Sequence, residues 1–157
     1  KSLLSRPDAV SPHREFLAPS RFREVLPDPD APAPDQVTRA VFCTGKVYYD
    51  LAACRKERNI ADTVIIRLEQ IYPLAREQLT FLLAPYQKVR DFVWCQEEPS
   101  NMGAWGHLRN RLGHLFATSF RYAGRPPMAC PAEGAKALHA AAQKRLLAAA
   151  FGPRTQS

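Results

Sequence analysis

Apolar and polar residues follow two different periodicities in this chain, and both become regular from residue 38 onward. Short apolar runs rich in β-branched and aromatic residues predict buried strands. These runs cover residues 39–43, 63–68, 91–96 and, more weakly, 120–123. Apolar residues at helical spacing lie between and after them. These helical segments cover residues 46–58, 75–84, 101–116 and 135–151. Strands that alternate with helices of this length predict an α/β domain of three layers, with a mostly parallel sheet covered on both faces.

The first 36 residues have a different pattern, because seven of the chain's 14 prolines lie there. Proline fixes its own φ angle and favours extended geometry in the residue before it. We therefore expect an N-terminal arm over 1–36 with short helical turns, such as one at 22–26, and a linker at 28–34. The α/β domain is expected over 37–152, and a tail over 153–157.

Length and composition limit the class of protein. The chain has 157 residues, of which 46% are hydrophobic and 24% charged, so we expect one globular domain and an arm. No apolar run approaches the roughly 20 residues that span a bilayer, so no transmembrane helix is expected. Residue 1 is Lys and no apolar leader follows, which indicates a piece of a longer chain without a signal peptide.

The charged residues and cysteines narrow the choice of partner. The 22 Lys and Arg exceed the 15 Asp and Glu, but they are scattered, which favours a solvated face or an anionic partner over nucleic acid. The four cysteines show no CxxC spacing, so neither a metal site nor a disulfide framework is expected. Cys43 and Cys95 lie in apolar runs and are predicted to be buried free thiols, as in a reducing compartment.

Candidate ligand-binding residues follow the first two long strands, since ligands of parallel sheets gather at the carboxyl ends of the strands. Thr44 and Lys46 flank a glycine at the start of a helix, where free N–H groups attract anions such as phosphate. An ordinary strand–helix turn is the alternative. Arg67 shares a strand face with Glu69 and could pair with it or reach a ligand. Further along, Gln70 leaves the strand, and Arg76 is expected in the first turn of the next helix.

The segment after the third strand offers carboxylates but no complete reactive set. Glu97 and Glu98 are adjacent in sequence and point in different directions, so an ion pair, a helix cap or a subunit contact is favoured over acid/base work. Trp105 is either an interface anchor or a core residue. His107 and His114 are seven residues apart, too far for a metal-chelating i, i+4 pair. We therefore expect no catalytic residue in this chain.

Five segments occur in a fixed order and together carry a family resemblance. They are FCTGKVYYDL (42–51), IIRLEQIYPL (65–74), FVWCQEEP (92–99), NMGAW (101–105) and YAGRP (122–126). The chain closely resembles the C-terminal domain of 2-oxoglutarate dehydrogenase, the thiamine-diphosphate-dependent decarboxylating component, from residue 1 to about residue 151. The resemblance implies a transketolase-type fold and a parent enzyme that transfers a succinyl group to a lipoyl acyltransferase in the tricarboxylic acid cycle.

The resemblance also implies partners and cofactors. Thiamine diphosphate and Mg²⁺ are held by preceding domains in such enzymes, so this fragment is expected to be inactive alone and to bind neither. It implies a homodimer contact, which we assign to Glu97, Glu98, Trp105 and Tyr122. It further implies a site for an effector such as AMP or acetyl-CoA, which we assign to Thr44, Lys46, Arg67, Gln70 and Arg76.

Substrate, location and alternative functions complete the expectations from sequence. The parent's preference for 2-oxoglutarate or 2-oxoadipate does not follow from this domain. A bacterial cytoplasmic location is favoured over the mitochondrial matrix. A stand-alone nucleotide-binding or interaction module without catalysis is the alternative function, and a flavodoxin-like redox protein is a weaker one.

Overall fold

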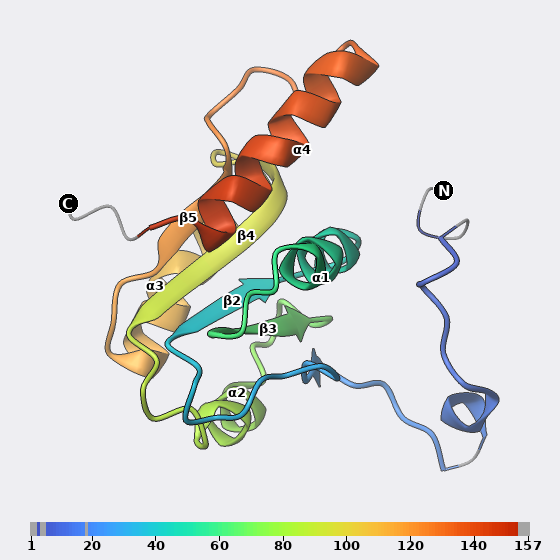
Figure 1. Ribbon diagram of the computed structural model, residues 1–157, viewed down its shortest axis with the longest axis vertical. Helices are drawn as coiled ribbons and strands as arrows, with labels where there is room; N and C mark the ends of the chain where they lie inside the picture. The colour runs from blue at the N-terminus through green and yellow to red at the C-terminus, as the bar shows by residue number, and fades with distance from the viewer. Residues whose placement is uncertain (1–2, 4–5, 18, 154–157) are drawn as a thin grey trace.

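A five-stranded sheet organises the protein, as the computed structural model of residues 3, 6–17 and 19–153 shows (Figure 1). The strand order is β1-β3-β2-β4-β5, and only β1 runs antiparallel to its neighbour. The strands are β1 (Val25–Leu26), β2 (Arg39–Cys43), β3 (Thr63–Leu68), β4 (Asp91–Pro99) and β5 (Arg121–Arg125). The helices are η2 (His13–Phe16, a 3₁₀ helix), α1 (Val47–Glu57), α2 (Arg76–Leu83), α3 (Trp105–Phe116) and α4 (Lys136–Phe151).

Helices cover both faces of the sheet, which confirms the predicted three-layer α/β fold. Side chains alternate across β3, so Val64 and Ile66 join one core and Ile65 the other. The first core contains Leu79 of α2 with Leu108 and Leu112 of α3, and the second contains residues of α1 and α4. The strands pack apolar side chains on both sides, which explains why they have continuous apolar sequences rather than alternating ones.

The start of α3 differs from the prediction. The helix begins at Trp105 rather than at residue 101. The Asn101 side chain exchanges two hydrogen bonds of 3.0 Å with the backbone of Met128. Gly103 has a φ of 66°, a left-handed conformation that breaks the chain direction just before the helix. The segment 101–104 is therefore a turn tied to the loop after β5.

The prediction of a helical turn at 22–26 is wrong, because Val25 and Leu26 form β1 and pair with the edge of β3. Pro27 disfavours helical geometry in the residue before it, and β3 offers unpaired backbone groups there. Beyond this two-residue strand, a carboxylate oxygen of Asp28 accepts the N–H of Ile65 at 2.9 Å. The same carboxylate accepts two hydrogen bonds from Arg55 of α1. Asp28 thus anchors the expected linker to the sheet.

The amino ends of the strands are tied to the last helix. Asp91 accepts hydrogen bonds from Arg39 at 2.7 Å and from Arg121 at 3.1 Å. The two guanidinium groups also donate to backbone carbonyls at the end of α4, including those of Phe151 and Ala149. Cations at a helix C-terminus satisfy its free carbonyls and its dipole. Burial of Asp91 alone would raise its pKa, but the two arginines outweigh burial and lower it.

Within residues 3, 6–17 and 19–153, no helix combines the length and the apolarity needed to cross a bilayer.

Candidate functional site

The turn after β2 places Lys46 at the carboxyl end of the sheet. Gly45 has a φ of 67°, which a glycine adopts without strain, and this turn leads directly into α1. The Lys46 ammonium donates to a carboxylate oxygen of Glu97 at 2.7 Å and lies 3.5 Å from Asp50. Burial disfavours the charged ammonium, but the two carboxylates outweigh it and raise the pKa of Lys46. Lys46 is therefore held as a cation between two acids.

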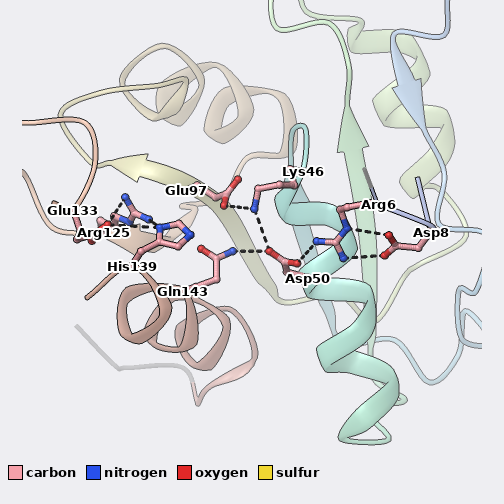
Figure 2. A network of polar contacts seen from close by, with 9 residues as sticks. All are labelled: Arg6, Asp8, Lys46, Asp50, Glu97, Arg125, Glu133, His139 and Gln143. Carbon is pink, nitrogen blue, oxygen red and sulfur yellow. Dashed lines mark hydrogen bonds and ion pairs between the residues drawn. The ribbon is translucent and has the colours of Figure 1, made fainter. Parts of the chain in front are cut away.

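Asp50 extends this contact into a network that joins three parts of the chain (Figure 2). Arg6 of the arm donates to Asp50 at 2.6 Å, and the Gln143 amide of α4 donates to it at 2.7 Å. Arg6 also donates twice to Asp8, at 2.8 and 2.9 Å. The hydrogen bonds to Asp8 and Asp50 raise the pKa of Arg6, and the bond from Arg6 lowers the pKa of Asp8. The network fixes the arm and α4 against α1.

A second polar cluster lies beside this network in Figure 2 and was not predicted from the sequence. Arg125, at the end of β5, forms an ion pair of 2.8 Å with Glu133 and contacts Nδ1 of His139 at 2.9 Å. The Arg125 side chain is only 5% exposed, so its charge needs this acidic partner. No sequence spacing indicated the cluster, since a loop of seven residues separates Arg125 from Glu133.

Arg67 uses its charge inside the fold. Its side chain shares the sheet face of Ile65 and packs beneath α1, where the guanidinium carbon lies 4.4 Å from the centre of the Tyr48 ring. Its Nε lies 3.0 Å from Glu69, and it donates to the Tyr49 hydroxyl at 3.3 Å. Of the two predicted uses of Arg67, the structure contains the ion pair with Glu69.

Gln70 and Arg76 lie apart from the other predicted effector residues. They line a shallow pocket of about 390 Å³ at the start of α2, together with Glu24 and Glu77. The Gln70 amide donates to the carbonyl of Pro73 at 2.8 Å. Because α1 and α2 cover opposite faces of the sheet, the predicted residues divide into two groups. Thr44, Lys46 and Arg67 lie with α1, and Gln70 and Arg76 with α2.

The predicted interface residues also lie in two places. Glu97 pairs with Lys46, whereas Glu98 is exposed and its backbone carbonyl accepts the Tyr122 hydroxyl at 2.9 Å. The rings of Trp105 and Tyr122 pack against each other with centres 5.3 Å apart, and both residues are half-buried. Burial raises the pKa of Tyr122 to about 12.

Gln96 is the structural hub that sequence reasoning missed. It is buried at the end of β4, and its side-chain oxygen accepts hydrogen bonds from the Trp94 indole at 2.8 Å and the Trp105 backbone at 3.0 Å. Its amide nitrogen donates to the Met102 carbonyl at 2.8 Å. Gln96 thereby sets where α3 begins. Its role could not be predicted from local sequence, because its hydrogen-bond partners are known only once the chain is folded.

The described cysteines include the two predicted buried thiols. Cys43 and Cys95 are buried and free, as is Cys54, and Cys130 is exposed. Burial raises the pKa of the first two thiols well above the usual range. Among the described residues, no group of three or more His, Cys, Asp or Glu side chains is arranged to hold a metal ion.

The arrangement of strands and helices gives the fold class. A solved structure described as "Split gene transketolase, inactive beta4 tetramer" superposes on 72% of this chain and 38% of its own chain with a TM-score of 0.52. Its sequence identity of 12% means that the likeness shows the fold alone. The protein therefore has a transketolase-like α/β fold.

The family follows from sequence. The family described as 2-oxoglutarate dehydrogenase C-terminal matches residues 10–151, so the chain belongs to it, as the quoted segments predicted. The 2-oxoglutarate dehydrogenase E1 component of Cupriavidus necator is 44% identical over 96% of this chain, and that of Azotobacter vinelandii is also 44% identical. The mitochondrial 2-oxoglutarate dehydrogenase of Caenorhabditis elegans is 40% identical over 97% of it. The chain spans only 16%, 16% and 15% of these relatives.

Proposed function

We propose that this chain is the C-terminal domain of the E1 component of a 2-oxoglutarate dehydrogenase. In this proposal the parent enzyme decarboxylates 2-oxoglutarate and transfers the succinyl group to a lipoyl acyltransferase. The observation that carries the proposal is the 44% identity to such components over 96% of the chain, together with the family match over residues 10–151. The bacterial relatives support a cytoplasmic location.

Thiamine diphosphate supplies the decarboxylation chemistry in the proposed parent, with Mg²⁺ to hold its diphosphate. The described residues do not fit such a group, because no three acidic, His or Cys side chains are placed to hold a metal. The cations at the carboxyl edge, Lys46 and Arg67, are already ion-paired with Glu97 and Glu69. We therefore assign no step of the reaction to a residue of this chain. Its proposed role is to pack against the domains that hold the cofactor.

A graft tests this proposal. The C-terminal sixth of the Cupriavidus necator E1 component is replaced by residues 1–157 of this chain, and CO₂ release from 2-oxoglutarate is measured with thiamine diphosphate and Mg²⁺. We expect activity within about tenfold of the parent, while the parent truncated before this sixth has none. A graft that folds, as its circular dichroism and elution volume show, but is as inactive as the truncated parent would contradict the proposal.

A finer part of the proposal concerns regulation by an anionic effector such as AMP or acetyl-CoA. What supports it is position, since Thr44 and Lys46 follow the carboxyl end of β2 and lie with Arg67, near the end of β3, on the α1 side of the sheet. Gln70 and Arg76 follow β3 on the α2 side. Because Lys46 is paired with Glu97, a phosphate would have to replace that carboxylate. Effector binding would then loosen the contact between β4 and α1.

Calorimetric titration of the graft with AMP and with acetyl-CoA tests this finer proposal. We expect the Lys46→Ala graft to bind either effector at least tenfold more weakly. The matched control is Lys88→Ala, which removes an exposed cation from the loop before β4. Equal binding by the Lys46→Ala graft would exclude the assignment.

The other finer part is the homodimer contact at Glu97, Glu98, Trp105 and Tyr122. Its support is the half-buried aromatic pair of Trp105 and Tyr122 beside the exposed Glu98. Aromatic side chains with part of their area exposed are typical anchors of interfaces. We expect Trp105→Ala to weaken the dimer of the graft in sedimentation experiments. Unchanged self-association would contradict this assignment.

A further inference from the structure

The net charge of +7 resides entirely in the last third of the chain. Residues 1–98 carry fourteen Lys and Arg and fourteen Asp and Glu, whereas residues 99–157 carry eight Lys and Arg against the single acid Glu133. Glu133 pairs with Arg125, and Arg121 pairs with Asp91. The described cations left exposed in this part are Arg109 and Arg111 of α3 with Lys136, Lys144 and Arg145 of α4. Both helices are free of acidic residues.

These two helices flank an open edge of the sheet. Among the described residues, β5 pairs with β4 alone, so one row of its backbone N–H and C=O groups has no strand partner. At the opposite edge, β1 has only two residues and lies next to Pro27 and Pro29, features that discourage further pairing. β5 is longer, with five residues and no proline inside the strand, and Pro126 and Pro127 follow it directly, so an added strand can pair with residues 121–125.

Arg109 lies on the side of α3 that faces β5. Residues four apart share one face of a helix, and Trp105, four residues before Arg109, packs its ring against Tyr122 of β5. His107 contacts Tyr72 in the loop before α2, on the far side from β5. Because residues two apart are rotated by about 200°, Arg109 lies opposite His107 and next to the edge strand.

Arg145 occupies the corresponding place on α4, across the sheet. Gln143 bonds Asp50 of α1, which places its side of the helix toward α1. Arg145 is two residues further on and therefore lies on the opposite side. The carbonyl of Ala149, one turn beyond Arg145 on the same face, accepts Arg121 of β5 at a distance of 2.5 Å. Helix geometry thus places one arginine above the open edge and one below it, and neither forms an ion pair with another described residue.

We propose that the β5 edge binds an extended acidic segment of another polypeptide, which adds to the sheet as a sixth strand. Backbone hydrogen bonds to β5 would supply the pairing, and Arg109 and Arg145 would contact acidic side chains on the two faces of the added strand. The positive charge around β5 favours an acidic segment over a second copy of the chain, because two copies paired strand to strand at β5 would place Lys and Arg side chains against each other. This surface is separate from the proposed effector site. It adjoins the proposed homodimer contact, which uses the Trp105 and Tyr122 rings on the α3 face of the sheet rather than the backbone edge of β5.

The test uses the chain of residues 1–157 and three synthetic peptides of nine residues. The first has the sequence Val-Val-Glu-Glu-Val-Val-Glu-Glu-Val, which places Glu on both faces of an extended strand. The second has Lys in place of every Glu, and the third is the first with N-methyl groups on its four central amides. Fluorescence anisotropy at low salt measures binding, and amide hydrogen exchange locates it. We expect only the first peptide to bind, to bind more weakly as salt is raised, and to protect amides within residues 121–125. Equal binding of the Lys peptide or of the methylated peptide, or protection elsewhere, would overturn the proposal.

Charge reversal tests the two arginines. The double variant Arg109→Glu and Arg145→Glu should bind the acidic peptide roughly tenfold more weakly, since two favourable surface contacts become repulsive. The matched control, Lys56→Glu with Arg58→Glu, makes the same charge change at the end of α1, away from β5. Circular dichroism confirms the fold of each variant. Equal weakening in both variants would indicate a general effect of net charge and would refute a site at β5.

Discussion

Asp28 carries the sharpest stability prediction, because one buried carboxylate joins three elements. It accepts two hydrogen bonds from Arg55 of α1 and one from the N–H of Ile65 in β3. The Asp28 side chain is 1% exposed and that of Arg55 is 7% exposed. Asp28→Ala would therefore leave a buried guanidinium with no acidic partner and a strand N–H without an acceptor.

Removal of one partner from a buried ion pair costs about 3–5 kcal/mol. A small domain has a free energy of unfolding of about 5–15 kcal/mol, so this single change would remove a large part of it. Urea unfolding at pH 7 measures the loss. In a double-mutant cycle, Asp28→Ala with Arg55→Ala should cost less than the sum of the two single changes, because the second change removes the charge that the first left unpaired.

The control is Glu15→Ala, which breaks the exposed ion pair with Arg23 in the arm. Exposed pairs contribute about 0–1 kcal/mol, so this variant should have a urea midpoint close to that of the unchanged chain. A loss for Asp28→Ala no greater than that of Glu15→Ala, or full additivity in the cycle, would refute the role assigned to Asp28.

Three further outcomes follow from the packing. The lowered pKa of Asp91 means that its contribution to stability is present at neutral pH and is lost as pH falls below the ordinary value of 3.8. The difference in free energy of unfolding between the unchanged chain and Asp91→Asn should therefore become smaller in acid, and a difference that stays constant with pH would contradict this. Gly103→Ala should lower the free energy of unfolding by about 1–3 kcal/mol, because the φ of Gly103 is positive and the new Cβ would lie 3.0 Å from Gln96. Gly106→Ala, which has open space around it in α3, should raise that free energy by up to about 1 kcal/mol, and equal effects of the two changes in thermal melts would disprove the argument. A maleimide reagent should modify Cys130 in the native protein and the three buried thiols only in denaturant, and prompt native labelling of all four, counted by mass spectrometry, would be inconsistent with the burial seen here.

The sequence predicted β2 and β3 to the residue, because their cause is local, whereas β4 extends three residues beyond the predicted 91–96. The strands at 39–43 and 63–68 are continuous apolar runs, and both of their faces are buried. The pair of Arg67 and Glu69 was predictable as well, since residues two apart share one face of a strand. In contrast, β1 has two residues and therefore no periodicity, and its formation depends on the free edge of β3.

The polar network at the carboxyl edge depends on contacts between distant parts of the chain. Lys46 and Glu97 are separated by 51 positions, and Asp50 and Gln143 by 93. The i, i+4 spacing of Lys46 and Asp50 is typical of a helical ion pair, but no spacing indicated that Glu97 would be the nearer carboxylate. Nor did any pattern indicate that the predicted effector residues lie on two faces of the sheet. These contacts form only when the strand–helix–strand connections bring distant parts of the chain side by side.

The central claim is that this chain supplies packing and binding surfaces, while decarboxylation takes place on other domains of the parent. Its most direct test is CO₂ release from 2-oxoglutarate by the isolated chain, with thiamine diphosphate and Mg²⁺ in excess. We expect a rate equal to that of the buffer blank. A rate above the blank that rises in proportion to the concentration of the chain would contradict the account.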